Sequence, residues 1–318
     1  GATHEHGAQD HDANALGAAA SALSAPEAAP EAAPEAAAVF TPAADDILRF
    51  PRGPSAGDCI HALFEAIDFT DPGTWDSAIA AALAAHPQVL PAAPKPGEAP
   101  LAAMLRSVLD AVLNTSLLPA AGAPAERAAD TRCGEEGRAE LRLNTVAPAR
   151  CLVELGFHLP APDLRASALN TWLAAQGYVV PRLAFKDLDG YLKGYIDLIF
   201  EHDGRYWVLD WKSNHLGVQP QDYAPARLET AMQTHGYHLQ HLLYSVALHR
   251  HLGRSLAGYD YESHFGGVLY LFVRGVRPQW RIDGVPCGVF HQRCPAAVLA
   301  SLDALLAGVA TADVQEPA

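Results

Sequence analysis

Residues 194–214, GYIDLIFEHDGRYWVLDWKSN, constrain the fold of this chain more than any other stretch. An Asp-Gly pair at 203–204 stands between two runs of alternating apolar residues, which predicts two antiparallel strands joined by a two-residue turn. In that register Asp197 stands directly opposite Asp210. Because like charges directly opposite each other destabilise a sheet, a positive group is expected beside them. Lys212 lies on the same face as Asp210, two residues further along the strand.

Two carboxylates and a lysine on one sheet face suit the hydrolysis of a phosphodiester. Carboxylate oxygens are the ligands that Mg²⁺ prefers, and the ion presents a bound water as the nucleophile. A lysine stabilises the negative charge that develops. The same spacing also fits a salt-bridged hairpin face exposed to solvent. Tyr206 and Val208 share the face of Asp210 and favour the first interpretation, because they place apolar bulk beside the carboxylate.

The remaining chain alternates helical and strand patterns, which predicts a mixed α/β fold. Apolar spacing indicates a first helix over 57–67 and short helices joined by loops over 75–118. A surface loop is expected at 119–140 and a strand within 149–160. A second Asp-Gly pair, at 189–190, predicts a three-stranded meander over 181–213. One long helix over 227–252, stopped by Gly253, and a buried strand over 266–275 should follow.

Residues 1–46 form a separate segment by composition. The stretch SAPEAAPEAAPEAAA, residues 24–38, has no aromatic or branched apolar side chain, so we expect a disordered Ala/Pro/Glu-rich linker. The first 50 residues hold eight acidic side chains and one arginine, and thus half of the net charge of −14. The remaining acidity does not exclude a DNA substrate, because metal ions neutralise acidic ligands.

Cysteine usage and hydropathy indicate the cellular compartment in which the protein is expected. The five cysteines include no C-x-x-C pair, which fits reduced thiols better than a disulfide framework or a zinc site. We find no secretory leader and no apolar run of about 18 residues. The expectation is therefore a cytoplasmic protein, acting with the nucleoid and not in a membrane. The chain begins without Met, which suggests a fragment.

Six stretches occur in an order that resembles the RecB family of nucleases, within the PD-(D/E)XK superfamily. They are GDCIHALFE, VELGFHLP, GYIDLIF, YWVLDWKSNHLG, YHLQHLLYSVALHRHL and YDYESHFGGVLYLFVRG. The resemblance implies a restriction-endonuclease-like α/β fold, in which a central mixed sheet is flanked by helices and preceded by an N-terminal helical region. Residues 47–318 would form this nuclease domain.

The resemblance also implies roles for seven residues. It makes Asp197 and Asp210 metal ligands, Lys212 the catalytic lysine, and His61 and Glu154 further metal ligands. Gln240 and Tyr244 match the family's catalytic Gln-x-x-x-Tyr helix, and their spacing places them on one helix face, with Tyr237 one turn earlier. The implied cofactor is Mg²⁺, with Mn²⁺ also suited to an imidazole ligand. Trp211 departs from the family's usual tyrosine, and by alternation its side chain faces away from the site.

Two functions of different classes remain open. The resemblance implies an exonuclease and endonuclease of the exodeoxyribonuclease V type, which acts on single- and double-stranded DNA at double-strand-break ends in recombinational repair. Its partners would be the gamma and alpha subunits of exodeoxyribonuclease V and the strand-exchange recombinase. The alternative is a docking module that binds those proteins without cutting. No G-x-x-x-x-G-K-[ST] motif occurs, so this chain does not hold the ATP-driven motor.

Overall fold

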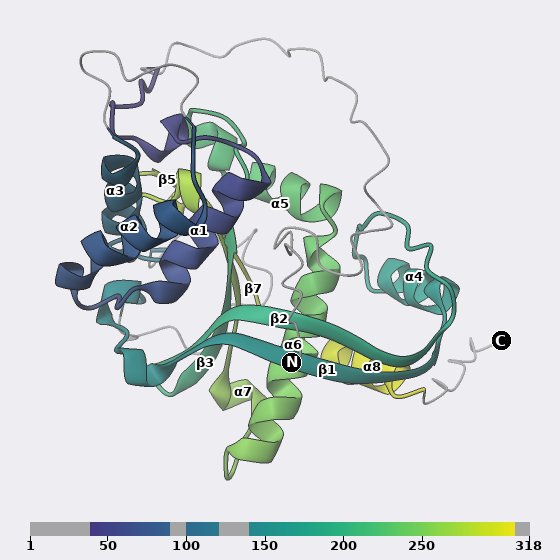
Figure 1. Ribbon diagram of the computed structural model, residues 1–318. Coiled ribbons are helices and arrows are strands. Elements are labelled where there is room, and N and C mark those ends of the chain that lie inside the picture. Colours follow the sequence, from purple (N-terminus) through teal and green to yellow (C-terminus); the bar gives the residue numbers. More distant parts are fainter. Residues whose placement is uncertain (1–38, 90–99, 121–139, 309–318) are drawn as a thin grey trace, which may run out of the picture.

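The computed structural model describes residues 39–89, 100–120 and 140–308 (Figure 1). Its centre is a five-stranded sheet in the order β1-β2-β3-β4-β7. The strands are β1 (Cys151–Leu164), β2 (Leu188–His202), β3 (Arg205–Lys212), β4 (Phe265–Phe272) and β7 (Val289–Gln292). Since β3 and β4 are parallel and the other neighbours antiparallel, the sheet is mixed, as predicted. A small hairpin adds β5 (Arg281–Ile282) and β6 (Val285–Pro286).

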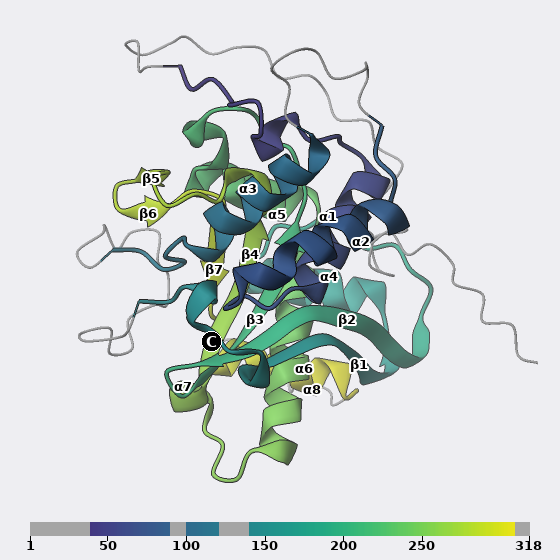
Figure 2. The ribbon, with the colours of Figure 1, turned by 60° about the vertical axis from the view of Figure 1, so that its left-hand side comes forward.

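Helices cover both faces of the sheet. On one side lie α1 (Pro54–Ala66), α2 (Trp75–Ala85) and α3 (Leu101–Leu113), and on the other α5 (Pro225–Thr234), α6 (Tyr237–Ser255) and α8 (Ala296–Leu306) (Figure 2). Helix α4 (Ala166–Ala175) joins β1 to β2, and α7 (Tyr261–His264) precedes β4. The remaining helical turns are of the 3-10 type: Ile47–Arg49, Pro72–Thr74, Leu143–Thr145, Pro148–Arg150, Pro220–Tyr223 and Val273–Gly275.

The strand residues divide between two hydrophobic cores according to the face on which they stand. Leu209 and Trp211 pack with α1, and Trp211 stacks on Phe64 with ring centroids 4.2 Å apart. Val208, from the other face of β3, belongs to the core that contains α6. Trp211 therefore points away from the candidate site, as alternation predicts. The same alternation sends Asp210 and Lys212 toward α6.

The hairpin predicted from Asp203-Gly204 is confirmed. Leu198 pairs with Leu209, and His202 pairs with Arg205. Asp203 and Gly204 both have positive φ, at 52° and 74°, as a two-residue turn of this twist requires. The register therefore continues outward from the pair 198/209 to place Asp197 opposite Asp210.

The second predicted turn, at Asp189-Gly190, is wrong. Gly190 lies inside β2 and pairs with Ala161 of β1. The strand β1 is 14 residues long, so it offers a partner to this part of β2 and keeps the chain extended through the Asp-Gly pair. The meander consists of β1, β2 and β3, with α4 inserted between the first two. The β1–β2 pair forms a long curved ribbon that runs toward α4 (Figure 1).

The single long helix predicted over 227–252 is also wrong. Gly236 has a left-handed backbone with φ 71°, which ends α5 and begins α6. Gly253, predicted to stop the helix, is followed by two more helical residues, since α6 ends at Ser255. The break reorients the chain immediately before Tyr237, the first residue of α6.

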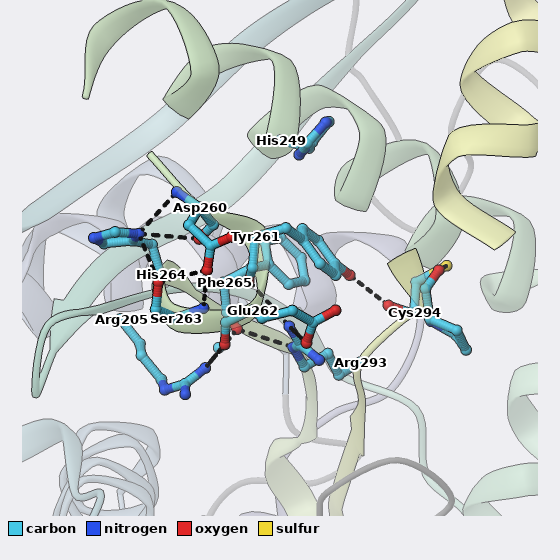
Figure 3. Close-up of polar contacts among 12 residues, drawn as sticks. Arg205, His249, Asp260, Tyr261, Glu262, Ser263, His264, Phe265, Arg293 and Cys294 are labelled. Atoms are coloured by element: carbon cyan, nitrogen blue, oxygen red, sulfur yellow. Dashed lines mark hydrogen bonds and ion pairs between the residues drawn. The ribbon is translucent and has the colours of Figure 1, made fainter. Parts of the chain in front are cut away.

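Two arginines fix the turn that leads from α6 into β4 (Figure 3). Arg205, the first residue of β3, donates to the backbone oxygens of Glu262 and Phe265. Arg293 donates to the Phe265 oxygen and forms an ion pair of 2.7 Å with the Glu262 carboxylate. These contacts hold the start of β4 against β3. They lie at the opposite end of β3 from Lys212, roughly 20 Å away by strand rise.

The N-terminal end of the described chain is packed against the fold. Phe40 packs edge-on against Trp280, and Asp46 forms a bidentate ion pair with Arg277 at 2.7 and 2.8 Å. The domain start at residue 47 stays a prediction, but the packed region includes Phe40 and Asp46. Residues 1–38 of the linker predicted over 1–46, and most of the loop predicted over 119–140, lie outside the described residues.

No helix in the described ranges combines the length and apolar character needed to cross a membrane. The four cysteines within these ranges, which exclude Cys133, are free thiols.

Candidate active site

Asp197, Asp210 and Lys212 come together where β2 and β3 lie side by side. Their side chains are buried: Lys212 is 0% exposed, Asp210 2% and Asp197 8%. The Lys212 ammonium lies 2.8 Å from Asp210 Oδ2. A solvated salt bridge on a hairpin surface is excluded by this burial. Buried charges need partners of opposite sign. The partner of Asp210 is Lys212, two residues further along the same strand.

Two tyrosine rings enclose the ammonium of Lys212. Its Nζ lies 4.0 Å from the ring centroid of Tyr237, at the start of α6, and 5.6 Å from that of Tyr270, on β4. Both distances lie within the range of cation–π attraction. Burial raises the pKa of Tyr270, and the negative charge of Asp210 adds to the effect. Tyr270 thus remains a neutral phenol. Tyr270 lies in a uniformly apolar run, so the sequence pattern alone does not indicate its place beside Lys212.

Asp197 accepts a hydrogen bond from the backbone N–H of Trp211, at 2.8 Å to its Oδ2. The same oxygen lies 3.5 Å from Nδ1 of His61, which α1 contributes. Burial raises the pKa of Asp197 well above its usual range, and Asp210 raises it further, while Lys212 and the Trp211 N–H oppose the shift. A bound cation would offset the cost of burying this negative charge and would lower the pKa of the carboxylate.

Glu65, a residue not predicted from the sequence, also acts on Asp197. Its negative charge contributes to the raised pKa of Asp197. Glu65 follows His61 by one helical turn on α1, so the two side chains share a helix face. That i to i+4 spacing was the signal available in the sequence.

Gln240 and Tyr244 form a chain of hydrogen bonds that ends on Asp210. The Gln240 amide donates to the Tyr244 hydroxyl at 2.9 Å, and this hydroxyl donates to Asp210 Oδ1 at 3.1 Å. The hydroxyl and Lys212 thus engage different oxygens of one carboxylate. Both helix residues orient Asp210 and are positioning residues. Phe157 packs edge-on against Tyr244, with centroids 5.8 Å apart.

Glu154 lies on β1, in line with the two aspartates across the sheet. Its neighbours Val153 and Leu155 pair with Leu198 and Ile196, which places Glu154 opposite Asp197. Its φ of 51° is unusual for a residue other than glycine. The side chain is exposed. Strain of this kind inside a strand increases the local twist and is common beside functional sites.

The donor set fits a hard divalent cation. Two adjacent carboxylates with oxygens in a buried environment, and an imidazole nitrogen 3.5 Å from one of them, are ligands that Mg²⁺ or Mn²⁺ accepts. Within the described residues, no group of three or more His, Cys, Asp or Glu side chains already surrounds a common ion position. Glu154 is exposed, so its side chain would have to turn inward to join the two aspartates around an ion.

Comparison with known proteins agrees with the fold. The model of the PD-(D/E)XK nuclease superfamily matches residues 42–283. The chain is 36% identical to the RecBCD enzyme subunit RecB of Escherichia coli K12 over 267 residues, which cover 82% of this chain and 20% of that protein. The RecB subunit of Mycobacterium tuberculosis H37Rv is 35% identical over 284 residues, covering 80% of this chain and 24% of that protein.

The chain therefore belongs to the PD-(D/E)XK nuclease superfamily. Within it, the chain is a RecB-family nuclease domain. It spans about a fifth to a quarter of the length of these relatives. The similarity favours the nuclease over the non-cleaving docking module.

Proposed function

We propose that this domain hydrolyses phosphodiester bonds of DNA with Mg²⁺ as its cofactor, and that Mn²⁺ can replace it. The observation that carries the proposal is the convergence of Asp197, Asp210 and Lys212 in a buried site on adjacent strands. Asp197 and Asp210 would hold the ion, with His61 and Glu154 as further ligands. When bound, the ion polarises the phosphoryl group and supplies an activated water.

The residues of the chain prepare this site in three ways. Lys212 places a fixed positive charge where the phosphate gains negative charge in the transition state. The chain of Gln240 and Tyr244 holds one oxygen of Asp210, and the Trp211 N–H holds one oxygen of Asp197. Because these donors are fixed before substrate binds, the carboxylates need little reorganisation during the reaction.

The relatives are named as subunits of the RecBCD enzyme, so the partners of the whole protein are proposed from them. We propose that the intact protein assembles with gamma and alpha subunits and cuts single- and double-stranded DNA at double-strand-break ends, as exodeoxyribonuclease V does. The strand-exchange recombinase is a further proposed partner. The location would be the cytoplasm, with the nucleoid DNA.

Cleavage of linear and circular single-stranded DNA by the 318-residue chain tests the proposal. With Mg²⁺ the unaltered chain should cut, while Asp210→Asn and Lys212→Met should lose at least 100-fold in rate, since each removes a charge from the site. Asp76→Ala, on the exposed face of α2, is the matched control and should cut normally. Attack on the circle would demonstrate endonuclease activity. A folded chain that binds Mg²⁺ without cutting either substrate would contradict the proposal.

A further inference from the structure

Two tyrosines on the β1–β2 ribbon stand out from the other aromatic residues. Among the aromatic side chains that the structure describes, Tyr191 and Tyr195 alone are exposed, at 60% and 52%. Both belong to β2 and are four residues apart, so they share one face of the ribbon at roughly 13 Å along the strand. Large exposed apolar groups gathered on one surface mark a binding site more often than chance exposure does.

The strand register defines the rest of this face, which we call the tyrosine stripe. Lys193 stands between the two tyrosines on β2. Across the ribbon, Tyr195 pairs with Gly156, Lys193 with His158 and Tyr191 with Pro160. All six residues are exposed. The stripe therefore alternates ring, cation and ring along one edge, with an imidazole beside the cation.

The missing side chain of Gly156 leaves room for the ring of Tyr195. A Cβ at position 156 would lie 3.3 Å from the Tyr195 ring, which shows that the ring lies across the backbone of the neighbouring strand. One face of the ring is thus supported by the ribbon, and half of the residue remains accessible. A ring held in this way is a rigid platform that loses little conformational entropy when another flat group stacks on it.

The tyrosine stripe leads to the candidate active site. Asp197 follows Tyr195 by two residues on the same strand, and Glu154 stands opposite Asp197 on β1. Ile196 and Ile199 both pack in the core that contains α6, so the strand twists strongly between the stripe and Asp197, and the two are linked by their closeness along β2. The ribbon extends from the sheet toward α4, so the stripe lies on an arm that reaches away from the site (Figure 1).

We propose that the tyrosine stripe binds the unpaired DNA strand and guides it to the Asp197–Asp210 site. This inference rests on the proposed nuclease function. Bases stack on aromatic side chains only where their faces are free, which a single strand offers and a duplex does not. Lys193 and His158 lie where the backbone phosphates of a strand stacked on both rings would pass. The strand rise of roughly 13 Å between the two tyrosines exceeds one nucleotide step, so the two rings would stack on different bases of the strand.

A protein partner is the other class of ligand for an exposed aromatic surface. Protein interfaces are depleted of lysine at their centre, where side chains become dry. Lys193 occupies the centre of the tyrosine stripe, between the two rings. A solvated cation at this place suits a phosphate backbone better than an apolar protein surface.

The test is the affinity of the full chain for a fluorescent 12-nucleotide oligothymidine, measured by anisotropy with Ca²⁺ in place of Mg²⁺. Tyr191→Ala with Tyr195→Ala should weaken binding by at least 10-fold, because each stacked base contributes roughly 5- to 150-fold. Tyr195→Phe, which keeps the ring, should bind as the unaltered chain does. Lys193→Ala should lower the salt dependence, with a slope in log affinity smaller by about 0.7. Arg254→Ala, an exposed cation at the end of α6, is the matched control and should leave this slope unchanged.

The possible outcomes distinguish DNA binding by the tyrosine stripe from the proposed nuclease activity. Unchanged oligothymidine affinity in the folded double tyrosine variant would overturn the inference, and continued Mg²⁺-dependent cutting by that variant would leave the proposed function intact. An equal loss of affinity for a blunt duplex would also overturn it, since duplex bases cannot stack on the rings. Loss of a protein contact with DNA affinity preserved would assign the stripe to a partner instead. Selective loss of single-strand affinity in a chain that never cuts would support the stripe and refute the nuclease.

Discussion

The buried pair of Asp210 and Lys212 predicts an unequal response to removing one charge or the other. At 2.8 Å the direct attraction is about 6 kcal/mol for an effective dielectric constant near 20, before the cost of desolvation. Removing one member of a buried pair typically costs 3–5 kcal/mol, because the other charge is left uncompensated. Lys212→Met leaves two carboxylates facing each other, whereas Asp210→Asn leaves Lys212 near Asp197 and beneath two tyrosine rings.

We therefore expect Lys212→Met to reduce the free energy of unfolding by about 5 kcal/mol and Asp210→Asn by about 3 kcal/mol. The variant with both substitutions should be close to the unaltered chain, because the pair is replaced by neutral groups of similar volume. Urea denaturation at pH 7.5, without divalent cations, measures all four proteins. Mg²⁺ at 100 times its dissociation constant should then stabilise the unaltered chain by about 2.7 kcal/mol.

Comparing the stability loss of the double variant with the sum of the two single losses tests this electrostatic account of the site. If the two single variants lose equal stability and the double variant loses their sum, the pair carries no coupling energy and the electrostatic account of the site is refuted. If Mg²⁺ stabilises Asp210→Asn as much as it stabilises the unaltered chain, Asp210 is not a ligand. Asp76→Ala serves as the control for removal of an exposed carboxylate and should change stability by less than about 0.5 kcal/mol.

Three further predictions concern other parts of the domain. Burial, reinforced by His238, lowers the pKa of His241 to about 3, so its contribution to stability is present above pH 6.5 and lost as the pH falls toward 3. His241→Leu should therefore flatten the pH dependence of unfolding in this window by up to about 5 kcal/mol, and an unchanged profile would contradict this. Arg274 donates to four backbone oxygens, and Arg274→Lys should lower the free energy of unfolding by about 3 kcal/mol in urea, against no change in the control Arg254→Lys. Glu154→Gly should keep or slightly raise the melting temperature, because glycine adopts a φ of 51° without strain, yet reduce cutting; a loss of stability would refute the strain argument.

Much of the candidate site follows from local sequence. The Asp203-Gly204 turn sets the register, and the two-residue period of a strand carries that register to Asp197, Asp210 and Lys212. The same period predicts that Trp211 turns away. These relations depend on backbone geometry within about 15 residues, so no tertiary contact is needed to derive them.

Two other predictions from local sequence were wrong, for different reasons. Asp189-Gly190 has the same composition as the true turn, but β1 supplies a pairing partner there and the chain stays extended. The break at Gly236 interrupts a helical pattern because the backbone at this glycine is left-handed. The pairing at Asp189-Gly190 is thus set by a distant strand, whereas Gly236 is itself a local signal for the end of a helix.

The sequence by itself determined which groups share one strand face, since a strand repeats every two residues whatever surrounds it. Only the tertiary structure decided that these groups are buried and what surrounds them. Tyr270 comes from β4 and Tyr237 from α6, and both reach Lys212, while His61 and Glu65 come from α1. Burial and electrostatic coupling depend on elements far apart in the chain, so the environment that gives the carboxylates their chemistry exists only in the folded domain.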